Sequence, residues 1–318
     1  MNNNMKYYWN KVKNIGTITL STILMCGISC TLRPSISAII ENEKSLIVHY
    51  INVGNADAHF VETPNKKTIL IDGGRDRNGK KIVSYIKNLG YEKIDWVIAT
   101  HPHKDHIGGL DYIMQRLDVE RVFDNGVNYN SKQYREYILC ANKNNREVIK
   151  RDTTIILDDE VETRFIVPYD NKEGYNKKTN DNSIVLRIQY KDASFLFLSD
   201  LEKEGEKDLL EDGKIDEKLD IDVLKIGHHG GKGSTKKELL KATSPKIAII
   251  PTRKWKKNSS PNKEVLDRLE NIGDISYYRT DLDGTIILKT NGQKYAVLTE
   301  QSLLEKISSI LIKIKNKP

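Results

Sequence analysis

Four potential metal ligands stand within six positions of one another in residues 100–110, THPHKDHIGGL. They are His101, His103, Asp105 and His106, and they follow WVIAT, an apolar run typical of a buried strand. In a loop that leaves a strand, alternate side chains can point toward one place. Imidazole nitrogens and carboxylate oxygens are the ligands that Zn²⁺ and similar divalent ions take. The spacing therefore predicts a metal site at the end of this strand.

Two more groups of candidate ligands follow apolar runs elsewhere in the chain. Asp200 follows FLFLS, and His228 and His229 follow VLKIG. The chain has 7 histidines, and only His49 and His59 lie outside these histidine motifs. The alternative is a surface loop that is rich in histidine by chance. The concentration of histidines at predicted strand ends argues against that alternative.

The elements that position these residues lie in residues 45–300, which we expect to form one domain. Strand-length apolar runs follow one another in places and alternate with helical periodicity in others, which predicts mixed sheets. That order favours an α/β sandwich of two mixed sheets packed face to face, with helices outside. The pattern predicts helices at 80–90, 107–117, 202–211 and 262–273, and a polar surface excursion around a short helix at 125–147.

The composition is that of a folded protein. The chain has 318 residues, of which 38% are hydrophobic and 30% charged. This is too apolar for a disordered chain and too polar for a protein with many membrane spans. A chain of this length buries a large core, and its 3 cysteines cannot build a disulfide framework.

Residues 1–30 have the pattern of a signal peptide or an N-terminal membrane anchor. Three lysines without an acid precede the apolar run 15–32, and small residues precede Cys30, loosely as in a lipoprotein cleavage site. Gly, Ser, Thr and β-branched residues interrupt the run, which disfavours a buried core helix. We therefore expect a protein that is secreted or anchored to the outer face of the cytoplasmic membrane, with its N-terminus contacting the membrane.

Residues 301–318 predict a basic C-terminal helix. Apolar residues recur there at helical spacing, with lysines between them. Packing against the domain is the favoured interpretation, and attachment to an anionic membrane surface is the alternative.

The net charge of +7 divides unevenly along the chain. The two terminal segments hold most of the excess, so the body is nearly neutral and the net charge says little about its partners. Within the body, residues 200–222 are strongly acidic and residues 225–263 are strongly basic. The basic block, which includes Lys232 and Trp255, predicts either a solvated surface or a groove that follows phosphates, with the indole stacking on a base.

The motifs resemble those of the metallo-β-lactamase fold superfamily. HPHKDH matches the HxHxDH signature, with TILIDGG upstream, FLSD as the later Asp motif and a histidine at a strand end. INVGNADAHFVETP, DNSIVLRI, KIGHHGGKGS and YRTDLDGTIIL further resemble segments of ComEC-type competence proteins and their stand-alone relatives. The resemblance covers about residues 46–300. It implies an αββα sandwich with a dinuclear metal site at one edge.

The resemblance also implies how the ligands divide between two metal ions. His101 and His103 would hold one ion, and Asp105 and His106 the other. Asp200 would bridge the two ions. His229 would complete the second site, with His228 handling a proton, although the opposite assignment of these two histidines stays open.

Three further positions gain a role through the same resemblance. Asp72 would orient a ligand histidine. Asn182 and Ser183 stand where other branches of the superfamily place a further histidine, which leaves the first ion short of a protein ligand. The sequence departs from the subgroup at Asn-Ala in VGNAD, at Ser199 and at Gly231.

The expected activity is hydrolysis by a hydroxide that two divalent ions, Zn²⁺ or Mn²⁺, activate, with Asp105 and His228 as catalytic residues. The favoured substrate is DNA or another anionic polymer, cleaved at a phosphodiester. A cell-wall phosphoester, a lactone or another small ester is an alternative substrate. An alternative function of a different class is a metal-binding module that takes part in DNA uptake without catalysing a reaction. No protein partner can be inferred.

Overall fold

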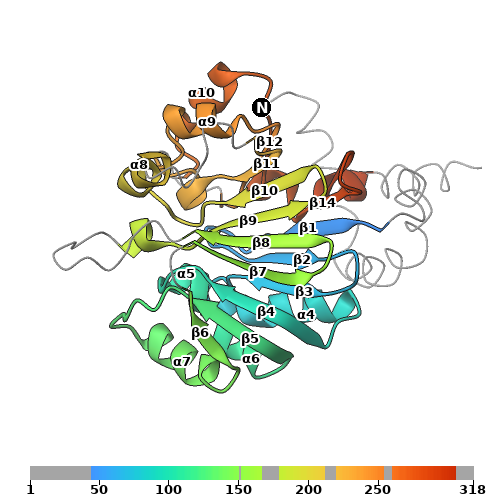
Figure 1. Ribbon diagram of the computed structural model, residues 1–318, viewed down its shortest axis with the longest axis vertical. Helices are drawn as coiled ribbons and strands as arrows, with labels where there is room; N and C mark the ends of the chain where they lie inside the picture. Colours follow the sequence, from blue (N-terminus) through green and yellow to red (C-terminus); the bar gives the residue numbers. More distant parts are fainter. Residues whose placement is uncertain (1–43, 150–151, 167–178, 212–219, 254–259, 306–318) are drawn as a thin grey trace, which may run out of the picture. The chain divides into compact units, whose positions relative to one another are not determined.

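Two mixed β-sheets form the centre of the described structure (Figure 1). The computed structural model describes residues 44–149, 152–166, 179–211, 220–253 and 260–305. The predicted signal or anchor at 1–30 and Trp255 lie outside the described residues. Of the predicted C-terminal helix, residues 301–305 are described and are helical.

The first sheet has eight strands, and the half that leads into the histidine loop 101–106 is parallel. β3, β4, β5 and β6 run parallel to one another, whereas the strands from β15 to β3 pair antiparallel. In order across the sheet the strands are β15 (Tyr295–Thr299), β14 (Ile286–Thr290), β1 (Leu46–Tyr50), β2 (His59–Glu62), β3 (Thr68–Ile71), β4 (Lys93–Ala99), β5 (Asp118–Asp124) and β6 (Arg146–Val148).

The second sheet has seven strands, of which β10 to β13 run parallel. In order across the sheet the strands are β13 (Ser276–Arg279), β12 (Ile247–Ile250), β11 (Val223–Lys225), β10 (Ala193–Phe197), β9 (Val185–Tyr190), β8 (Val161–Ile166) and β7 (Thr153–Asp158). The hairpin of β7 and β8 was not predicted. Its outer strand β7 alternates exposed and half-buried residues at the sheet edge, so it carries a weak apolar signal.

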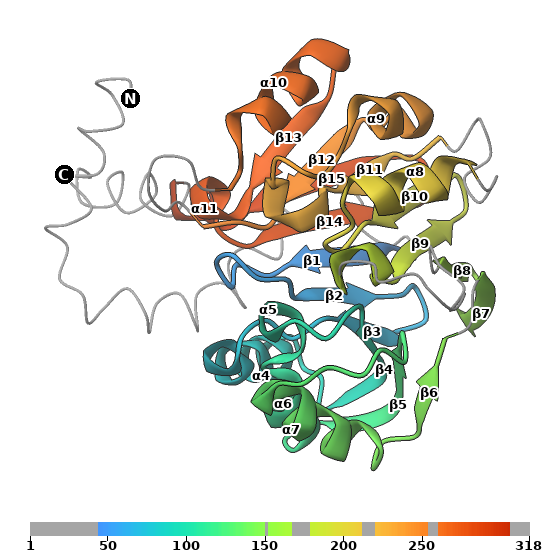
Figure 2. The ribbon, with the colours of Figure 1, turned by 90° about the vertical axis from the view of Figure 1, so that its left-hand side faces the viewer.

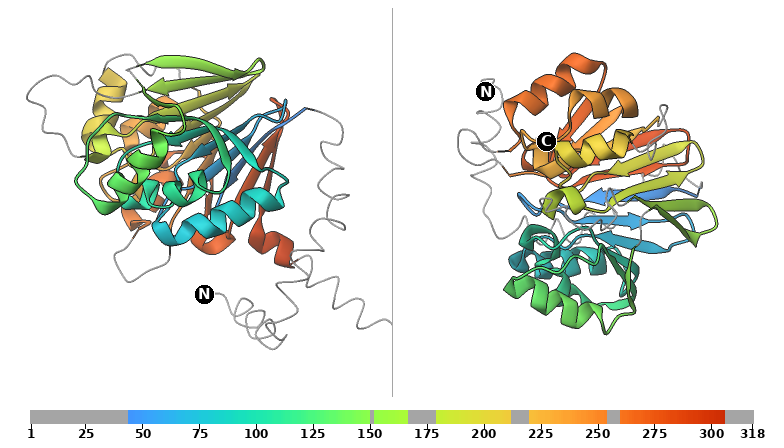
Figure 3. Two further views of the ribbon diagram at one scale, coloured as in Figure 1. Left: turned by 90° about the horizontal axis from the view of Figure 1, so that it is seen from below. Right: turned by 60° about the vertical axis from the view of Figure 1, so that its left-hand side comes forward.

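Three apolar layers hold the sandwich together. Trp96, Phe123 and Phe195 belong to the layer between the sheets. A second layer joins the first sheet to its helices, and a third joins the second sheet to its own helices. Figures 2 and 3 show these two groups of helices on opposite sides of the paired sheets. This arrangement confirms the predicted sandwich.

The helices are short and fall into those two groups. Those on the side of the first sheet are α4 (Gly79–Asn88), α5 (Lys104–Ile107), α6 (Leu110–Met114) and α7 (Lys132–Ala141). Those on the side of the second sheet are α8 (Lys203–Glu211), α9 (Lys237–Thr243) and α10 (Lys263–Ile272). The remaining helical turns are η1 (Asp76–Asn78), η2 (Thr179–Asn182), η3 (Gly227–Gly230) and α11 (Thr280–Asp283). No helix among the described residues combines the length and the apolar character needed to cross a bilayer.

The continuous helix predicted at 107–117 is wrong, because the chain breaks it at Gly108 and Gly109 into α5 and α6. A Cβ at Gly109 would lie 2.3 Å from the carbonyl oxygen of Gly73. The backbone N–H of Gly73 in turn donates to the carbonyl of His106 at 2.7 Å. The two loops therefore touch backbone to backbone, which only glycine permits. This contact sets the histidine loop against the end of β3.

Candidate metal centre

The site residues lie where parallel strands of both sheets end. Asp72 follows β3 and Thr100 follows β4, while Ser199 follows β10 of the other sheet. The hydroxyls of Thr100 and Ser199 lie 2.6 Å apart, so one buried hydrogen bond joins the two sheets at this edge. The carboxyl ends of neighbouring parallel strands lie on the same side of a sheet, which is why loops distant in sequence meet here.

Two groups of candidate ligands share Asp200. One consists of His101, His103 and Asp200, and the other of His106, Asp200 and His229; within each group the ligand atoms lie within 4.8 Å of one another. His106 Nε2 lies 3.2 Å from Asp200 Oδ2, and His229 Nε2 lies 3.6 Å from Asp200 Oδ1. The structure thus brings the three separate ligand motifs of the sequence to one place.

The chemistry of these atoms fits a divalent metal ion. His106 Nε2, His229 Nε2 and Asp200 Oδ1 are buried and have no hydrogen-bond partner. Leaving buried polar atoms unpaired is costly, and native proteins rarely do so without a ligand or water. Two imidazole nitrogens and a carboxylate oxygen are a set that Zn²⁺, Mn²⁺ or Fe²⁺ accepts.

Polar contacts behind the ligands fix their orientation. Asp72 Oδ2 lies 2.7 Å from Nδ1 of His106, and Asp72 also accepts from the backbone N–H of Thr100 at 2.9 Å. His229 Nδ1 lies 3.1 Å from the carbonyl oxygen of Pro251. Each contact places a proton on Nδ1 and leaves Nε2 free to face the cluster. Asp72 therefore lies where its predicted orienting role requires.

The two adjacent histidines of the HHG motif point to different environments. His228 has φ 44° and His229 has φ 52°, so both lie in the left-handed region that non-glycine residues seldom adopt. The side chain of His229 is buried among the ligands, whereas that of His228 is 36% exposed. The geometry thus places His229 in the ligand group and His228 beside it.

His228 is held in a form suited to giving up a proton. Its Nδ1 lies 2.8 Å from Glu202 Oε1, and its Nε2 lies 3.7 Å from Asp200 Oδ2. Burial disfavours the imidazolium, but the hydrogen bond with Glu202 and the nearby carboxylates outweigh it and raise the pKa of His228. Asn180 also donates to Glu202 at 3.3 Å.

Asp105 does not join either ligand group. Its Oδ2 accepts from Arg75 Nη2 at 2.7 Å, and the pair is partly exposed at the rim of the cluster. The roles in metal binding and catalysis that the resemblance implies for Asp105 therefore lack support in the distances.

Two buried charged residues next to the ligands were not predicted. Lys225 has a fully buried side chain whose ammonium contacts the carboxylate of Asp57 and donates to the carbonyl of Ser199 at 2.6 Å. Burial would raise the pKa of Asp57, but Lys225 and His229 hold it well below the usual range. Asp57 also lies within 4.8 Å of Asp72 and His106. In the sequence, the aspartate of VGNAD and the lysine of LKIG are single charged residues without a spacing pattern that would reveal their pairing.

The other predicted residues lie around the cluster without touching a ligand group. Ser183 is buried, and its hydroxyl has no hydrogen-bond partner. The backbone carbonyl of Asn182 accepts from the side chain of Asn125 at 2.9 Å. Lys232 pairs with Glu264 at 2.7 Å on the surface. No described distance ties these three residues to a metal.

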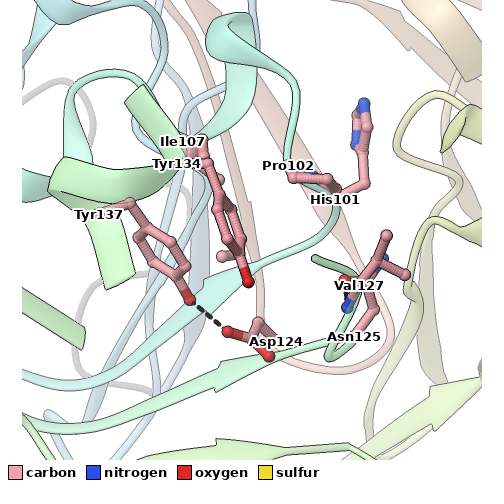
Figure 4. A pocket seen from close by; sticks show the side chains of 9 residues that line it. His101, Pro102, Ile107, Asp124, Asn125, Val127, Tyr134 and Tyr137 are labelled. Atoms are coloured by element: carbon pink, nitrogen blue, oxygen red, sulfur yellow. Dashed lines mark hydrogen bonds between the residues drawn. The ribbon is translucent and has the colours of Figure 1, made fainter. Parts of the chain in front are cut away.

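A small pocket lies beside His101 and Pro102 (Figure 4). Tyr134 and Tyr137 line it, and the hydroxyl of Tyr137 donates to Asp124 Oδ2 at 2.8 Å. The imidazole of His101 points away from these tyrosines (Figure 4). Ala99 and Pro102 also line the pocket, so it lies at the end of β4, where the histidine loop begins.

Comparison with known proteins identifies the family of this fold and site. The model of the metallo-β-lactamase superfamily matches residues 51–252. The chain belongs to this superfamily. Its members are usually hydrolases and bind divalent metals, often two. The ligand groups around Asp200 are the candidate metal-binding residues of this member.

The chain is also similar to competence proteins, which confirms the narrower resemblance. It is 31% identical to ComE operon protein 3 of Bacillus subtilis (strain 168), over 75% of this chain and 32% of that protein. It is 26% identical to competence protein ComA of Neisseria gonorrhoeae, over 86% of this chain and 36% of that protein. The chain thus matches about a third of the length of each relative.

A solved structure supports the fold. The metallo-β-lactamase fold protein YhfI of Bacillus subtilis superposes with a TM-score of 0.52 at 11% sequence identity. The match covers 78% of this chain and 100% of YhfI. At this identity the likeness shows the shared fold alone.

The contact of Asp72 with His106 predicts weaker metal binding when the carboxylate is removed. Asp72→Asn should lower the affinity for Mn²⁺ or Zn²⁺ by about 10- to 100-fold, because His106 loses the partner that fixes its orientation. Calorimetric titration of the metal-stripped protein measures this affinity. Asp111→Asn on α6, outside the cluster, is the control. Equal affinities of the Asp72 variant and the wild type would contradict the assignment.

The carboxyl group of Glu206 lies behind the HHG motif and should make the stability of the protein depend on pH. Its carboxylate accepts from the backbone N–H groups of Thr235 and Lys236, and the hydroxyl of Thr235 accepts from the backbone of Gly227 at 3.0 Å. Burial raises the pKa of Glu206 to about 7, although those N–H donors oppose the rise. Above this pKa the folded state must bury a carboxylate that the unfolded chain exposes.

The contribution of Glu206 to stability should therefore be lost as the pH rises from about 4.5 to 7. Glu206→Gln should remove about 2–3 kcal/mol of the fall in unfolding free energy between pH 5 and pH 8. Urea denaturation at both pH values measures the difference, and Glu204→Gln on the exposed side of α8 is the control. A pH slope that the Glu206 substitution leaves intact would show that Glu206 does not titrate in this range.

Proposed function

We propose that this protein is a metal-dependent phosphodiesterase that hydrolyses DNA or another anionic polymer outside the cytoplasmic membrane. The observation that carries the proposal is the buried cluster in which His106, His229 and Asp200 leave ligand atoms unpaired, with His228 beside it at a more exposed position. This combination provides metal-ion chemistry and a proton donor in one place.

The residues of the cluster divide the work of hydrolysis between them. A divalent ion, Zn²⁺ or Mn²⁺, supplies a hydroxide nucleophile near neutral pH when bound and stabilises charge on the attacked group. His106, His229 and Asp200 would hold it, and Asp72 would keep His106 in the orientation that binding needs. His101 and His103 offer a second set of nitrogens that shares Asp200.

His228 is the proposed proton donor to the leaving group. Its contact with Glu202 favours the imidazolium, and its partial exposure gives a substrate access to the ring. A leaving alkoxide of a nucleotide or sugar is a strong base, so a proton delivered in the transition state lowers the barrier substantially.

The preference for an anionic polymer rests on charge and on the relatives. The basic block of residues 225–263 begins in the strand that leads to the HHG motif and continues through α9, where Lys237 and Lys241 are exposed. Exposed lysines of this kind would attract a polyphosphate backbone. Similarity to competence proteins fits a DNA substrate at the cell envelope. The basic and apolar pattern of residues 1–30 favours a secreted or anchored form.

The test is a substrate panel with the metal-loaded full-length protein. Single-stranded DNA, duplex DNA, RNA, bis(p-nitrophenyl) phosphate, a choline phosphodiester, a lactone and a chromogenic β-lactam are each incubated with Mn²⁺ or Zn²⁺. We expect cleavage of DNA and of the aryl phosphodiester, and at least 100-fold less with Asp200→Asn. Turnover of the choline ester or lactone alone would overturn the DNA assignment. DNA binding without turnover of any substrate would indicate a binding module.

Replacement of His228 should lower the turnover rate by an amount that depends on the leaving group of the substrate. His228→Gln should lower kcat on DNA by about 10²- to 10⁴-fold, the range of general acid catalysis. The effect on bis(p-nitrophenyl) phosphate should be much smaller, because nitrophenolate leaves without a proton. Steady-state kinetics on both substrates measure the ratio. Equal losses on both substrates would instead assign His228 to metal binding.

A further inference from the structure

Tyr129 lies beside the candidate metal ligands and exposes an aromatic ring for which the proposed chemistry has no use. The residue is 36% exposed and belongs to none of the three apolar layers that the described residues form. We propose that Tyr129 stacks on an unpaired nucleobase next to the phosphodiester that is cleaved, and so selects single-stranded over duplex nucleic acid. The inference rests on the proposed function, because it names the polymer on which the metal centre acts.

Three rings lead outward from the metal site to the solvent. The ring centroids of His101 and His103 lie 4.8 Å apart, and the ring of Tyr129 follows that of His103 at 5.5 Å. Of these residues, His101 is buried, His103 is half-buried and Tyr129 is exposed. His101 and His103 form one ligand group with Asp200. A nucleotide whose phosphate contacts this group would therefore have its base within reach of the phenol ring.

Polar contacts on both sides of Tyr129 hold the loop that carries it. Asn125 Nδ2 donates to the backbone carbonyl of Asn182 at 2.9 Å, which joins the start of the loop to the other sheet. The hydroxyl of Tyr134, on α7, donates to Asn128 Oδ1 at 3.1 Å. The loop thus has anchors that do not involve the ring of Tyr129. A tyrosine offers a large, rigid contact surface and loses little conformational entropy when it binds a ligand.

Stacking on such a ring requires a base whose face is accessible. Every nucleobase has a π face, so an exposed aromatic side chain beside a strand binds bases with little regard to sequence. In a duplex the bases are paired and stacked on one another, and their faces become accessible only when the strand opens at a cost in free energy. A single strand presents its bases without this cost. The position of Tyr129 therefore favours a single-stranded substrate.

The test compares two single strands that differ only in their bases. One is an oligothymidylate, and the other has the same length and backbone but carries tetrahydrofuran abasic sites throughout. Fluorescence anisotropy with the metal-stripped full-length protein measures Kd without turnover, and cleavage with Mn²⁺ gives kcat and KM. Tyr129→Leu should raise Kd and KM for the oligothymidylate by about tenfold, the effect of losing one stacked base, and should leave kcat nearly unchanged. Its Kd and KM for the abasic strand should equal those of the wild type.

Conservative variants and a matched control separate stacking from a structural role. Tyr129→Phe and Tyr129→Trp should retain the affinity of the wild type for the oligothymidylate, because both keep an aromatic ring. Tyr277→Leu removes a tyrosine from β13, where its hydroxyl donates to Glu270, and should change neither affinity. The wild type should also bind single-stranded DNA more tightly than duplex DNA, and Tyr129→Leu should reduce this preference. Circular dichroism melts check that each variant is folded.

Equal losses of affinity for the oligothymidylate and the abasic strand in Tyr129→Leu would overturn this inference, and so would wild-type affinity of that variant for both strands. Either result, with cleavage of phosphodiesters retained, leaves the proposed hydrolase intact. A selective loss of affinity for the oligothymidylate, in a protein that cleaves no phosphodiester with Mn²⁺ or Zn²⁺, would support the base contact and overturn the proposed activity. A wild type that binds neither strand would overturn the inference.

Discussion

Buried negative charge is the constraint on which the rest of this site depends. Asp57, Asp72 and Asp200 are almost fully buried at the junction of the two sheets. Carboxylates withdrawn from water destabilise a fold unless cations or hydrogen-bond donors compensate them. Lys225 compensates Asp57 directly, and His106 lies between Asp72 and Asp200. The charge that remains uncompensated makes the cluster a suitable place for a divalent cation.

Strained backbone conformations carry several of these side chains to their positions. Asp72, Ser199, His228 and His229 all have positive φ angles, which are unfavourable for residues other than glycine. Such strain costs of the order of 1–3 kcal/mol per residue and persists where surrounding structure enforces it. Here the buried ends of parallel strands enforce it from both sheets. The fold thus tolerates a loss of stability in order to hold the ligands, and the residues that orient them, in place.

The sandwich and the ligand motifs could be predicted because their signals are local. Alternating apolar runs mark strands, and His101, His103 and His106 stand close enough in sequence to be recognised as a group. The contribution of Lys225 could not be predicted in this way, since a single lysine in an apolar strand carries no spacing pattern. The break at Gly109 also escaped prediction, because its cause is the carbonyl of Gly73, more than 30 residues away.

The sequence by itself determined which donors are available, the strands that carry them and the family to which they belong. Tertiary structure alone decided which donors meet. It placed His229 among the ligands and turned His228 toward Glu202, although the two are neighbours in the chain. It also paired Asp105 with Arg75 at the rim. The physical reason is that periodicity specifies local conformation, whereas the direction of a side chain in a loop depends on charges and backbone contacts from distant segments.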